Sequence, residues 1–185
     1  MDSLRSALSK RKLRRIEEAG ASQASVAVLL VDDPRAGLEA LFIKRAEHPL
    51  DPWSGQIALP GGRRDPEDTD LLATALREVK EETGISLSAR QLLGELDDLH
   101  PRTPSLPSIV IRPFVFGLSK RIAHTASSEV DACHWAGLKE LQASAGTASI
   151  VIKGAAREVP CFRVEGHALW GLTHRIVTQL LGLIG

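Results

Sequence analysis

The sequence has little of several residue types on which whole classes of function depend. Its 185 residues include two cysteines, no tyrosine, four phenylalanines and three tryptophans. Cys133 and Cys161 are far apart and belong to no Cys-x-x-Cys motif, so they give no case for a zinc or redox centre. We expect both to be reduced thiols in or near the core. So few aromatic rings also leave few platforms on which bases could stack.

An excess of one charge and long apolar runs are also missing. The chain carries 23 basic and 23 acidic residues, and a formal charge of zero argues against nucleic acid as a general partner, although local contacts could hold a short capped RNA. No apolar run reaches the roughly eighteen to twenty residues that cross a bilayer. The basic run from Lys10 to Arg15 interrupts the first twenty residues, where a signal peptide would need an apolar core. We therefore expect a cytoplasmic protein with no membrane partner.

The chain does have enough apolar residues, 43% of the total, to bury one core. The pattern predicts a basic N-terminal helix within residues 1–24 and a single domain over residues 25–185. The helix is expected over Asp2–Ala19, with Leu4 and Leu8 facing inward. Acidic residues beside the basic run favour a solvated face over contact with RNA or a membrane. A homodimer contact is a further role open to this helix.

Strand and helix patterns alternate along the rest of the chain. Apolar and β-branched stretches bounded by turn residues predict strands, which we place at residues 25–31, 38–44, 56–59, 91–97, 108–118, 129–135, 150–153 and 159–164. We expect the first two strands to pair as a hairpin. Helices are predicted from residue 70 to 84, over 138–142 and near the C-terminus to about residue 183. These patterns alone support a layered α/β or α+β domain.

Three carboxylates stand close together in the run Arg77-Glu78-Val79-Lys80-Glu81-Glu82-Thr83-Gly84-Ile85. Apolar residues before and within the run recur at three- and four-residue steps, which predicts an amphipathic helix closed by Gly84. On that helix Glu78, Glu81 and Glu82 converge on one edge. Their mutual repulsion calls for a cation, and Mg²⁺ and Mn²⁺ prefer oxygen ligands. A glutamate-rich stretch taken alone is more often a solvated helix face. The surrounding residues therefore decide between that face and a metal site.

Residues on both sides of the helix start extend this candidate site. Arg77 precedes Glu81 by four positions and can brace it with charge-assisted hydrogen bonds. Upstream, two glycines let the backbone approach a ligand closely, and carbonyl groups there, that of Gly62 included, could complete the coordination of a metal. Arg63 and Arg64 follow the glycines and are placed to meet phosphates, although either could equally be a solvated loop charge.

The stretch from Gly62 to Ile85 resembles the Nudix box. The usual form of that motif is Gly, five residues, Glu, seven residues, Arg-Glu, an aliphatic, any residue, Glu-Glu, any residue, Gly and an aliphatic. The right half matches at every defined position from Arg77 onward. The left half is one residue longer, because fourteen residues separate Gly62 from Arg77 where the pattern has thirteen. Asp68 stands where a count from Gly62 expects the glutamate, and Thr69 stands where a count back from Arg77 expects it.

Within that superfamily the loop most resembles the coenzyme A pyrophosphatase-like group. Pro60-Gly61-Gly62, the acidic residues 65–70 and Thr74-Ala75-Leu76-Arg77-Glu78 carry the likeness. The upstream signature of the group is present in part: Arg45 is kept, a second arginine is missing and Leu59 replaces phenylalanine. The resemblance implies a Nudix-type α/β/α sandwich with a mixed β-sheet. It also implies hydrolysis, dependent on Mg²⁺ or Mn²⁺, of a nucleoside diphosphate linked to another group, X.

The resemblance further implies candidate residues for the reaction and for the substrate. Arg77 and Glu78 belong to the catalytic set, and Glu129, which begins a Glu-Val pair typical of the group, is an extra metal ligand or general base. An exposed acid at a strand start explains Glu129 equally well, and sequence does not choose between Glu78 and Glu129 as the base. Further candidates for substrate contact are Arg45, Trp53, Arg63, Arg64, His100 and Arg102. Trp53 could stack on a base or simply pack, and the last two lie in a loop with three prolines, a common kind of substrate wall.

Three functions are therefore compared. The first is hydrolysis of coenzyme A or acyl-coenzyme A to 4′-phosphopantetheine and adenosine 3′,5′-bisphosphate. The second is the same chemistry on another substrate, either a small-molecule nucleotide (a nucleoside diphosphate sugar, ADP-ribose or a dinucleotide) or a capped RNA. The third is a binding module of the same fold that does not hydrolyse anything, which the presence of all three box glutamates disfavours.

Overall fold

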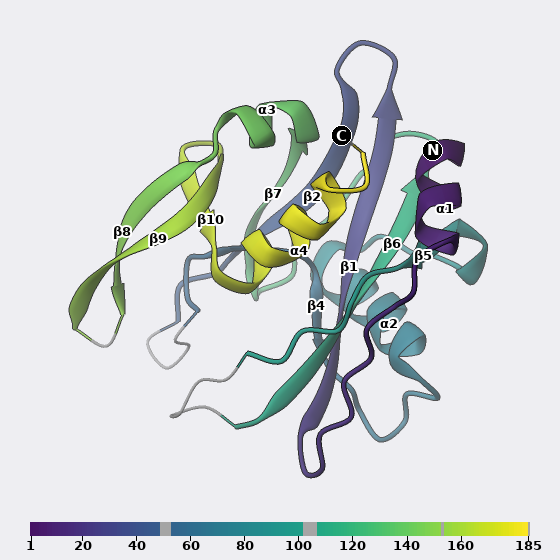
Figure 1. Ribbon diagram of the computed structural model, residues 1–185, viewed down its shortest axis with the longest axis horizontal. Coiled ribbons are helices and arrows are strands. Elements are labelled where there is room, and N and C mark those ends of the chain that lie inside the picture. Colours follow the sequence, from purple (N-terminus) through teal and green to yellow (C-terminus); the bar gives the residue numbers. More distant parts are fainter. Residues whose placement is uncertain (49–52, 102–106, 153, 185) are drawn as a thin grey trace.

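The structure is a computed structural model that describes residues 1–48, 53–101, 107–152 and 154–184. Figure 1 shows its elements in chain order. The helices are α1 (Asp2–Ser9), α2 (Leu71–Thr83), α3 (Leu138–Ala143) and α4 (Gly171–Leu181), with a 3₁₀ turn, η1 (Ala89–Gln91). The strands are β1 (Ser22–Asp33), β2 (Gly37–Arg45), β3 (Ile57–Ala58), β4 (Gly61–Arg63), β5 (Leu92–Glu95), β6 (Ile109–Leu118), β7 (Val130–Gly137), β8 (Gly146–Ile152), β9 (Ala155–Val164) and β10 (His167–Trp170).

The predicted mixed sheet with helices on both sides is confirmed. In the larger sheet β3, β2, β1, β6 and β5 lie side by side in that order, while β4 pairs with β1 and β7 pairs with β2. The pairing of β1 with β6 is parallel, and β1 forms the expected antiparallel hairpin with β2. β8, β9 and β10 form a second, antiparallel sheet. Figure 1 shows α2 behind the larger sheet, and α1, α3, α4 and the second sheet in front of it.

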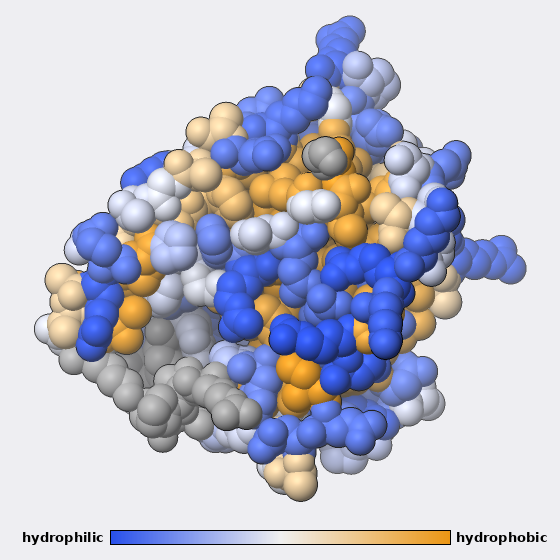
Figure 2. Space-filling model, in the orientation of Figure 1, coloured by the Kyte–Doolittle hydropathy of each residue, from blue (hydrophilic) through white to orange (hydrophobic). Residues whose placement is uncertain are grey.

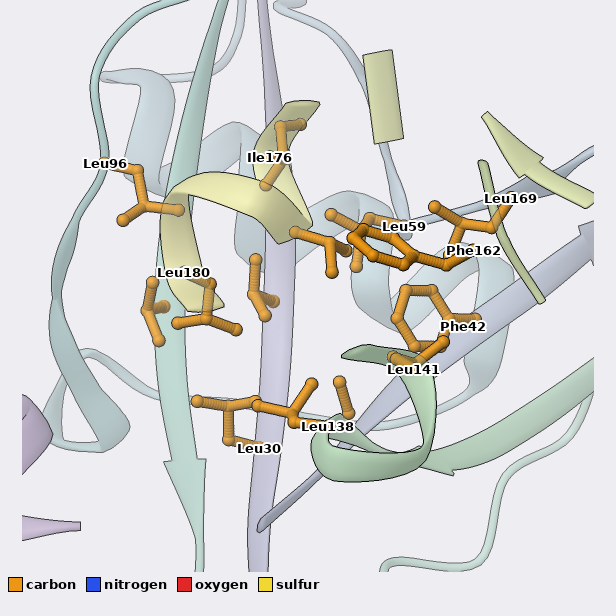
Figure 3. Close-up of a cluster of buried hydrophobic side chains, with 14 of the residues drawn as sticks. Leu30, Phe42, Leu59, Leu96, Leu138, Leu141, Phe162, Leu169, Ile176 and Leu180 are labelled. Carbon is orange, nitrogen blue, oxygen red and sulfur yellow. The ribbon is translucent and has the colours of Figure 1, made fainter. Parts of the chain in front are cut away.

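Two apolar clusters fill the layers on the two faces of the larger sheet. Successive residues of a strand point to opposite faces, and in β1 the side chains of Ala27, Leu29 and Val31 pack with the apolar side of α2. Val28 and Leu30 point the other way, into the cluster shown in Figure 3, which includes residues of α3, α4 and the second sheet. In the space-filling view of that side, hydrophobic surface gathers around α4 and hydrophilic residues surround it (Figure 2).

The N-terminal helix is shorter than predicted. Leu4 and Leu8 are buried as expected, but α1 ends at Ser9, whereas the expected helix runs on to Ala19. The basic run that follows is held in a non-helical course by acids next to β5: Arg11 pairs with Asp97 at 2.9 Å and Arg15 with the fully buried Asp98 at 3.1 Å. The carbonyl of Arg14 accepts from the N–H of Asp98. Long-range ion pairs therefore override the local helix pattern.

The burial of α1 bears on the suggested dimer contact. Because Leu4 and Leu8 belong to the core of their own chain, the apolar side of this helix is already used and lends no support to a homodimer. Of the helices in the described ranges, none has both the length and the apolar character that a bilayer crossing demands.

Two short strands, β4 and β10, were not predicted. β4 consists of Gly61, Gly62 and Arg63, and its two glycines have low strand propensity; it forms because its backbone pairs with Ala24–Val26 of β1. The stretch from His167 to Trp170, for which the sequence predicts no strand, pairs with β9 before α4 begins. The loop predicted to wall the substrate lies partly outside the described residues.

Candidate metal and phosphate site

Helix α2 forms as the sequence predicts because both of its ends carry local signals. The side chain of Asp70 accepts a hydrogen bond from the N–H of Ala73 at 2.8 Å, which caps the first turn. Gly84 takes the left-handed conformation (φ 70°) and ends the helix. Leu71, Ala75 and Val79 are buried against the sheet. This packing turns the edge that bears the glutamates toward β4.

The two glycines of β4 let the acids of α2 lie directly against the backbone. The N–H of Gly61 donates to Oε2 of Glu82 at 2.8 Å. A Cβ atom on Gly62 would lie 2.4 Å from Oε1 and 2.8 Å from Oε2 of Glu78, so this carboxylate fills the place of a side chain. A Cβ atom on Gly61 would lie 2.3 Å from the carbonyl oxygen of Ser25. Neither position has room for another residue without a shift of its neighbours.

Glu82 is the most buried of the three acids. Its exposed fraction is 5%, and burial raises the pKa of its carboxyl group to about 7, against the opposing hydrogen bond from Gly61. The charges of Glu78 and Glu129 raise this pKa further, and the charge of Arg45 lowers it. Burial likewise raises the pKa of Glu78, which Arg77 opposes. Both shifts arise mainly from burial, which disfavours the charged form of a carboxyl group, and a divalent cation bound beside it would favour that form.

The donor set fits Mg²⁺ or Mn²⁺, although Arg77 now stands between two of its members. Within the described ranges no three metal-binding side chains converge on one point. Nη1 of Arg77 donates to both Glu78 and Glu81, at 2.9 Å each, which includes the predicted brace on Glu81. A positive group therefore already bridges these carboxylates. A divalent ion held by Glu78, Glu81 and Glu82, with the carbonyl of Gly62 beside them, would displace that contact.

The other donors of Arg77 fix the loop that precedes the helix. Nε and Nη2 form a two-point contact with Asp68, at 3.1 and 3.0 Å, and Nη2 also donates to the carbonyl of Arg63 at 3.0 Å. Because its planar guanidinium group reaches β4, the loop and α2 at once, Arg77 sets the spacing between the glycines and the glutamates. These contacts position the acids, and a catalytic role for Arg77 stays a prediction.

Asp68, and not Thr69, takes the place of the box glutamate. It is buried, and it accepts hydrogen bonds from Oγ1 of Thr74 and the N–H of Asp65, both at 2.9 Å. Hydrogen bonds from Arg77 lower the pKa of its carboxyl group well below the usual range, against burial. An aspartate is one methylene shorter than a glutamate, and the loop is one residue longer. With both departures from the motif present, the carboxylate of Asp68 reaches Arg77.

Replacing Asp68 with asparagine should destabilise the protein in a pH-dependent way. The pKa of Asp68 is lower in the folded than in the unfolded protein, so its ionised form stabilises the fold above the unfolded value of about 4 and loses this effect as pH falls through the folded value. We expect the variant to unfold at a lower urea concentration than the parent at pH 7. The gap between the two unfolding midpoints should narrow from pH 5 to pH 3. Asp70→Asn, which keeps a capping side chain, is the control. A gap that is constant over this range would contradict the assignment.

The two arginines after the glycines differ in what they contact. Arg64 donates to the carbonyls of Asp68 and Thr69 and to Oε1 of Gln23, at 3.0–3.1 Å, and so ties the loop to β1. Arg63 is exposed at the end of β4. Phosphate contact by either one stays a prediction, and Arg63 is the better placed because the donors of Arg64 are in use.

The loop between β6 and β7 brings the chain near Glu129 to the end of α2. The N–H of Thr125 donates to the carbonyl of Thr83 at 2.8 Å, and that of Ser127 to the carbonyl of Glu82 at 3.2 Å. Earlier in the same loop, Arg121 forms a two-point ion pair with the buried Glu39 of β2. Glu129 is exposed, and its charge acts on Glu82. The loop that carries Glu129 is therefore anchored to the end of α2, and a role of Glu129 as a metal ligand or general base stays a prediction.

Cys133 is an unpredicted neighbour of the site. Both cysteines are free thiols in or near the core, as expected. Burial raises the pKa of Cys133, and the charge of Glu82 raises it further. Cys133 pairs with Ile43 across β7 and β2, a contact that only the folded sheet creates.

The remaining predicted substrate residues come from elements other than β4 and α2. Arg45 lies at the end of β2, and its charge lowers the pKa of Glu82. Trp53 is 46% exposed. The ring of His100 contacts Oγ of Ser108 at 2.9 Å and lies 4.0 Å from Glu18 of the N-terminal segment. Arg102 lies outside the described residues.

Comparisons with known proteins agree with this geometry. A family model of the NUDIX domain matches residues 21–153. A protein of Photorhabdus laumondii, named as an uncharacterized Nudix hydrolase NudL, is 32% identical over 142 residues, which are 76% of this chain and 74% of that protein. A crystal structure of a MutT/nudix family protein from Enterococcus faecalis aligns with a TM-score of 0.63 at 22% identity, over 96% of this chain and 71% of that one. The NUDIX domain of Shewanella oneidensis NrtR, complexed with ADP ribose, aligns with a TM-score of 0.55 at 22% identity, over 68% and 79%. These two structures show a shared fold.

Proposed function

The chain belongs to the Nudix hydrolase family, whose members act on nucleoside diphosphate derivatives, and on that premise we propose that it hydrolyses the diphosphate bond of coenzyme A or acyl-coenzyme A. The products are 4′-phosphopantetheine, or its acyl form, and adenosine 3′,5′-bisphosphate. The observation that carries the chemistry is the placement of Glu82 and Glu78 against the backbone of Gly61 and Gly62. The choice of coenzyme A is supported by the likeness of the Pro60–Gly62 and Thr74–Glu78 segments to that group.

The residues of the site divide the work of hydrolysis. Mg²⁺ or Mn²⁺, when bound, supplies positive charge to the phosphate oxygens and to the attacking water. Glu78, Glu81 and Glu82 would hold the ion, and Arg77, which also contacts Asp68, fixes their spacing. A further carboxylate takes the proton of the water as it attacks phosphorus. Arg63 and Arg45 supply positive charge at the edge of the site for the substrate phosphates.

Glu129 is the general base in this proposal. Glu78 is committed to Arg77 and to the backbone of Gly62, as suits a metal ligand, whereas Glu129 is exposed and comes from a separate loop. We expect Glu129→Gln to lower kcat by about 10² to 10³-fold and to leave Mn²⁺ affinity within a factor of about three, a change of less than 1 kcal/mol. Glu158→Gln, an exposed acid of β9, is the control for charge. Steady-state kinetics with calorimetric Mn²⁺ titration measures both quantities, and a variant with parental kcat would assign the base to Glu78.

A second substrate class keeps the same chemistry. The second arginine of the upstream signature is missing, and a structural neighbour is complexed with ADP ribose, so ADP-ribose, a nucleoside diphosphate sugar, a dinucleotide or a capped RNA is the alternative substrate.

We place this activity in the cytoplasm, which the two free thiols support, since reduced cysteines are usual in that compartment.

Product analysis by mass spectrometry tests the proposal. The purified protein is incubated with Mg²⁺ and a mixed panel of coenzyme A, ADP-ribose, nucleoside diphosphate sugars, dinucleoside polyphosphates and capped RNA. Release of 4′-phosphopantetheine and adenosine 3′,5′-bisphosphate is the expected result. Cleavage of another member with coenzyme A untouched would overturn the choice of substrate. No cleavage of any member would overturn the proposed activity on the tested classes.

A further inference from the structure

Ser25 is a buried serine beneath the candidate site. It lies in β1 directly opposite Gly62 of β4. Its odd-numbered neighbours Ala27 and Leu29 pack with α2, and since strand side chains alternate between faces, the side chain of Ser25 points to the α2 side as well. Its exposed fraction is 0%. The hydroxyl group is therefore enclosed between the sheet and the helix that carries the glutamates.

The hydroxyl group of Ser25 has no hydrogen-bond partner among the described residues. A buried hydroxyl without a partner destabilises a protein relative to an alanine of nearly the same shape. Other buried hydroxyls around α2 are satisfied: Thr74 donates to Asp68, and Thr83 donates to the carbonyl of Val79. An unsatisfied serine at this position indicates a partner that the side chain meets in another state of the site.

The carboxylate of Glu78 is the group best placed to become that partner. It fills the place of the missing Gly62 side chain, 2.4–2.8 Å from where a Cβ atom would be. Side chains directly opposite each other on paired strands have Cβ atoms roughly 5 Å apart. The Ser25 hydroxyl and the Glu78 carboxylate thus occupy adjacent places on one face of the sheet, with no side chain of Gly62 between them.

We propose that Ser25 is a positioning residue for Glu78 in the metal-loaded enzyme. When Glu78 turns from Nη1 of Arg77 toward a divalent ion, its carboxylate accepts a hydrogen bond from Oγ of Ser25. Such a bond to an ionised ligand fixes the orientation of the carboxylate and strengthens its hold on the metal. This inference rests on the proposed function, because it requires that the box glutamates bind a divalent cation.

Ser25→Ala separates this role from a purely structural one. In metal-free protein, the variant is expected to unfold at the same or a higher temperature than the parent, because an unsatisfied buried hydroxyl is removed. Calorimetric titration with Mn²⁺ is expected to show affinity that is lower by about 10-fold, the lower end of the effect of losing an outer-shell partner. The same variant should lose kcat with little change in KM. Ser149→Ala, the same change on the exposed strand β8, is the matched control and should match the parent in all three measurements.

The alternative outcomes are distinct. Parental Mn²⁺ affinity in Ser25→Ala would overturn the inference while leaving the proposed function intact. Lower metal-free stability with parental affinity would show that Ser25 only supports packing. A parent protein that binds no Mn²⁺ would overturn the proposed function and this inference together. If Ser25→Ala fails to fold, Ser25→Cys, which keeps a weak donor of similar size, should fold and show reduced Mn²⁺ affinity, and parental affinity in that variant would count against the proposal.

Discussion

Replacing Glu82 with glutamine is expected to lower kcat by about 10³-fold, the upper end of what removal of one preorganised electrostatic group costs, while the fold stays intact. The glutamine side chain has nearly the same shape, and its carbonyl oxygen can still accept from the N–H of Gly61. The variant loses only the negative charge. Because Glu82 is 5% exposed, water cannot replace that charge as a ligand to the metal.

The same substitution, which should lower turnover, is expected to raise the stability of the metal-free protein at pH 8. In metal-free protein the pKa of Glu82 is raised to about 7, above its unfolded value, chiefly by burial. An acid with a raised folded pKa destabilises the fold as pH rises from its unfolded value through its folded value. Glu82→Gln removes that effect. With a chelator present, we expect the variant to be more stable than the parent at pH 8 and to lose this advantage by pH 5.

Kinetics and urea unfolding of the same preparations check both expectations. Glu158→Gln, a change of the same kind on an exposed strand, should leave turnover and the pH dependence of stability as in the parent. Parental turnover in Glu82→Gln would contradict the metal-site assignment. Lower stability at pH 8 would show that the buried charge is balanced by groups of the protein itself.

Gly62→Ala is expected to reduce turnover by at least about 10²-fold, the effect of a misplacement of roughly 1 Å at a catalytic group. The added Cβ atom would lie within 2.8 Å of both carboxylate oxygens of Glu78. The carboxylate must move away, and Arg77, which contacts it at 2.9 Å, must follow or lose that hydrogen bond. The loss of activity comes from displaced ligands, since the chemical groups of the site are unchanged.

Gly146→Ala is the matched control for this substitution. A Cβ atom there would meet only the carbonyl oxygen of Ser144, at 3.9 Å, so turnover and melting temperature should equal those of the parent. Calorimetric Mn²⁺ titration of Gly62→Ala separates weakened metal binding from a fault in the substrate pose. Parental kcat and affinity in that variant would mean that Glu78 is free to move, and would remove it from the set of metal ligands.

The features predicted correctly from the sequence are those with local causes. Helix α2 could be placed because Asp70, Gly84 and the apolar spacing between them act within a few residues. The brace of Arg77 on Glu81 follows from helix geometry alone. Strand β4 was missed because Gly61 and Gly62 have low strand propensity and pair only in the presence of β1.

Features that depend on distant contacts could not be predicted in this way. Counting along the motif left Asp68 and Thr69 as equal candidates, and the two-point contact with Arg77 decides for Asp68. The approach of Cys133 to Glu82 depends on the pairing of β7 with β2, strands far apart in the chain. The N-terminal helix was overextended because its basic residues find acids near residue 98 that the local pattern does not show.

The anchoring of the N-terminal segment has a consequence for synthesis of the chain. Arg15 pairs with Asp98, 83 positions later, and Leu4 and Leu8 enter a core built from later elements. At the usual rate of translation the first residues therefore wait roughly 4 to 17 seconds for the partner that fixes them. During that time the two leucines have been synthesised but are without their core. Closure of this segment is consequently a late event of folding, reached only after the ribosome has completed β5 and β6.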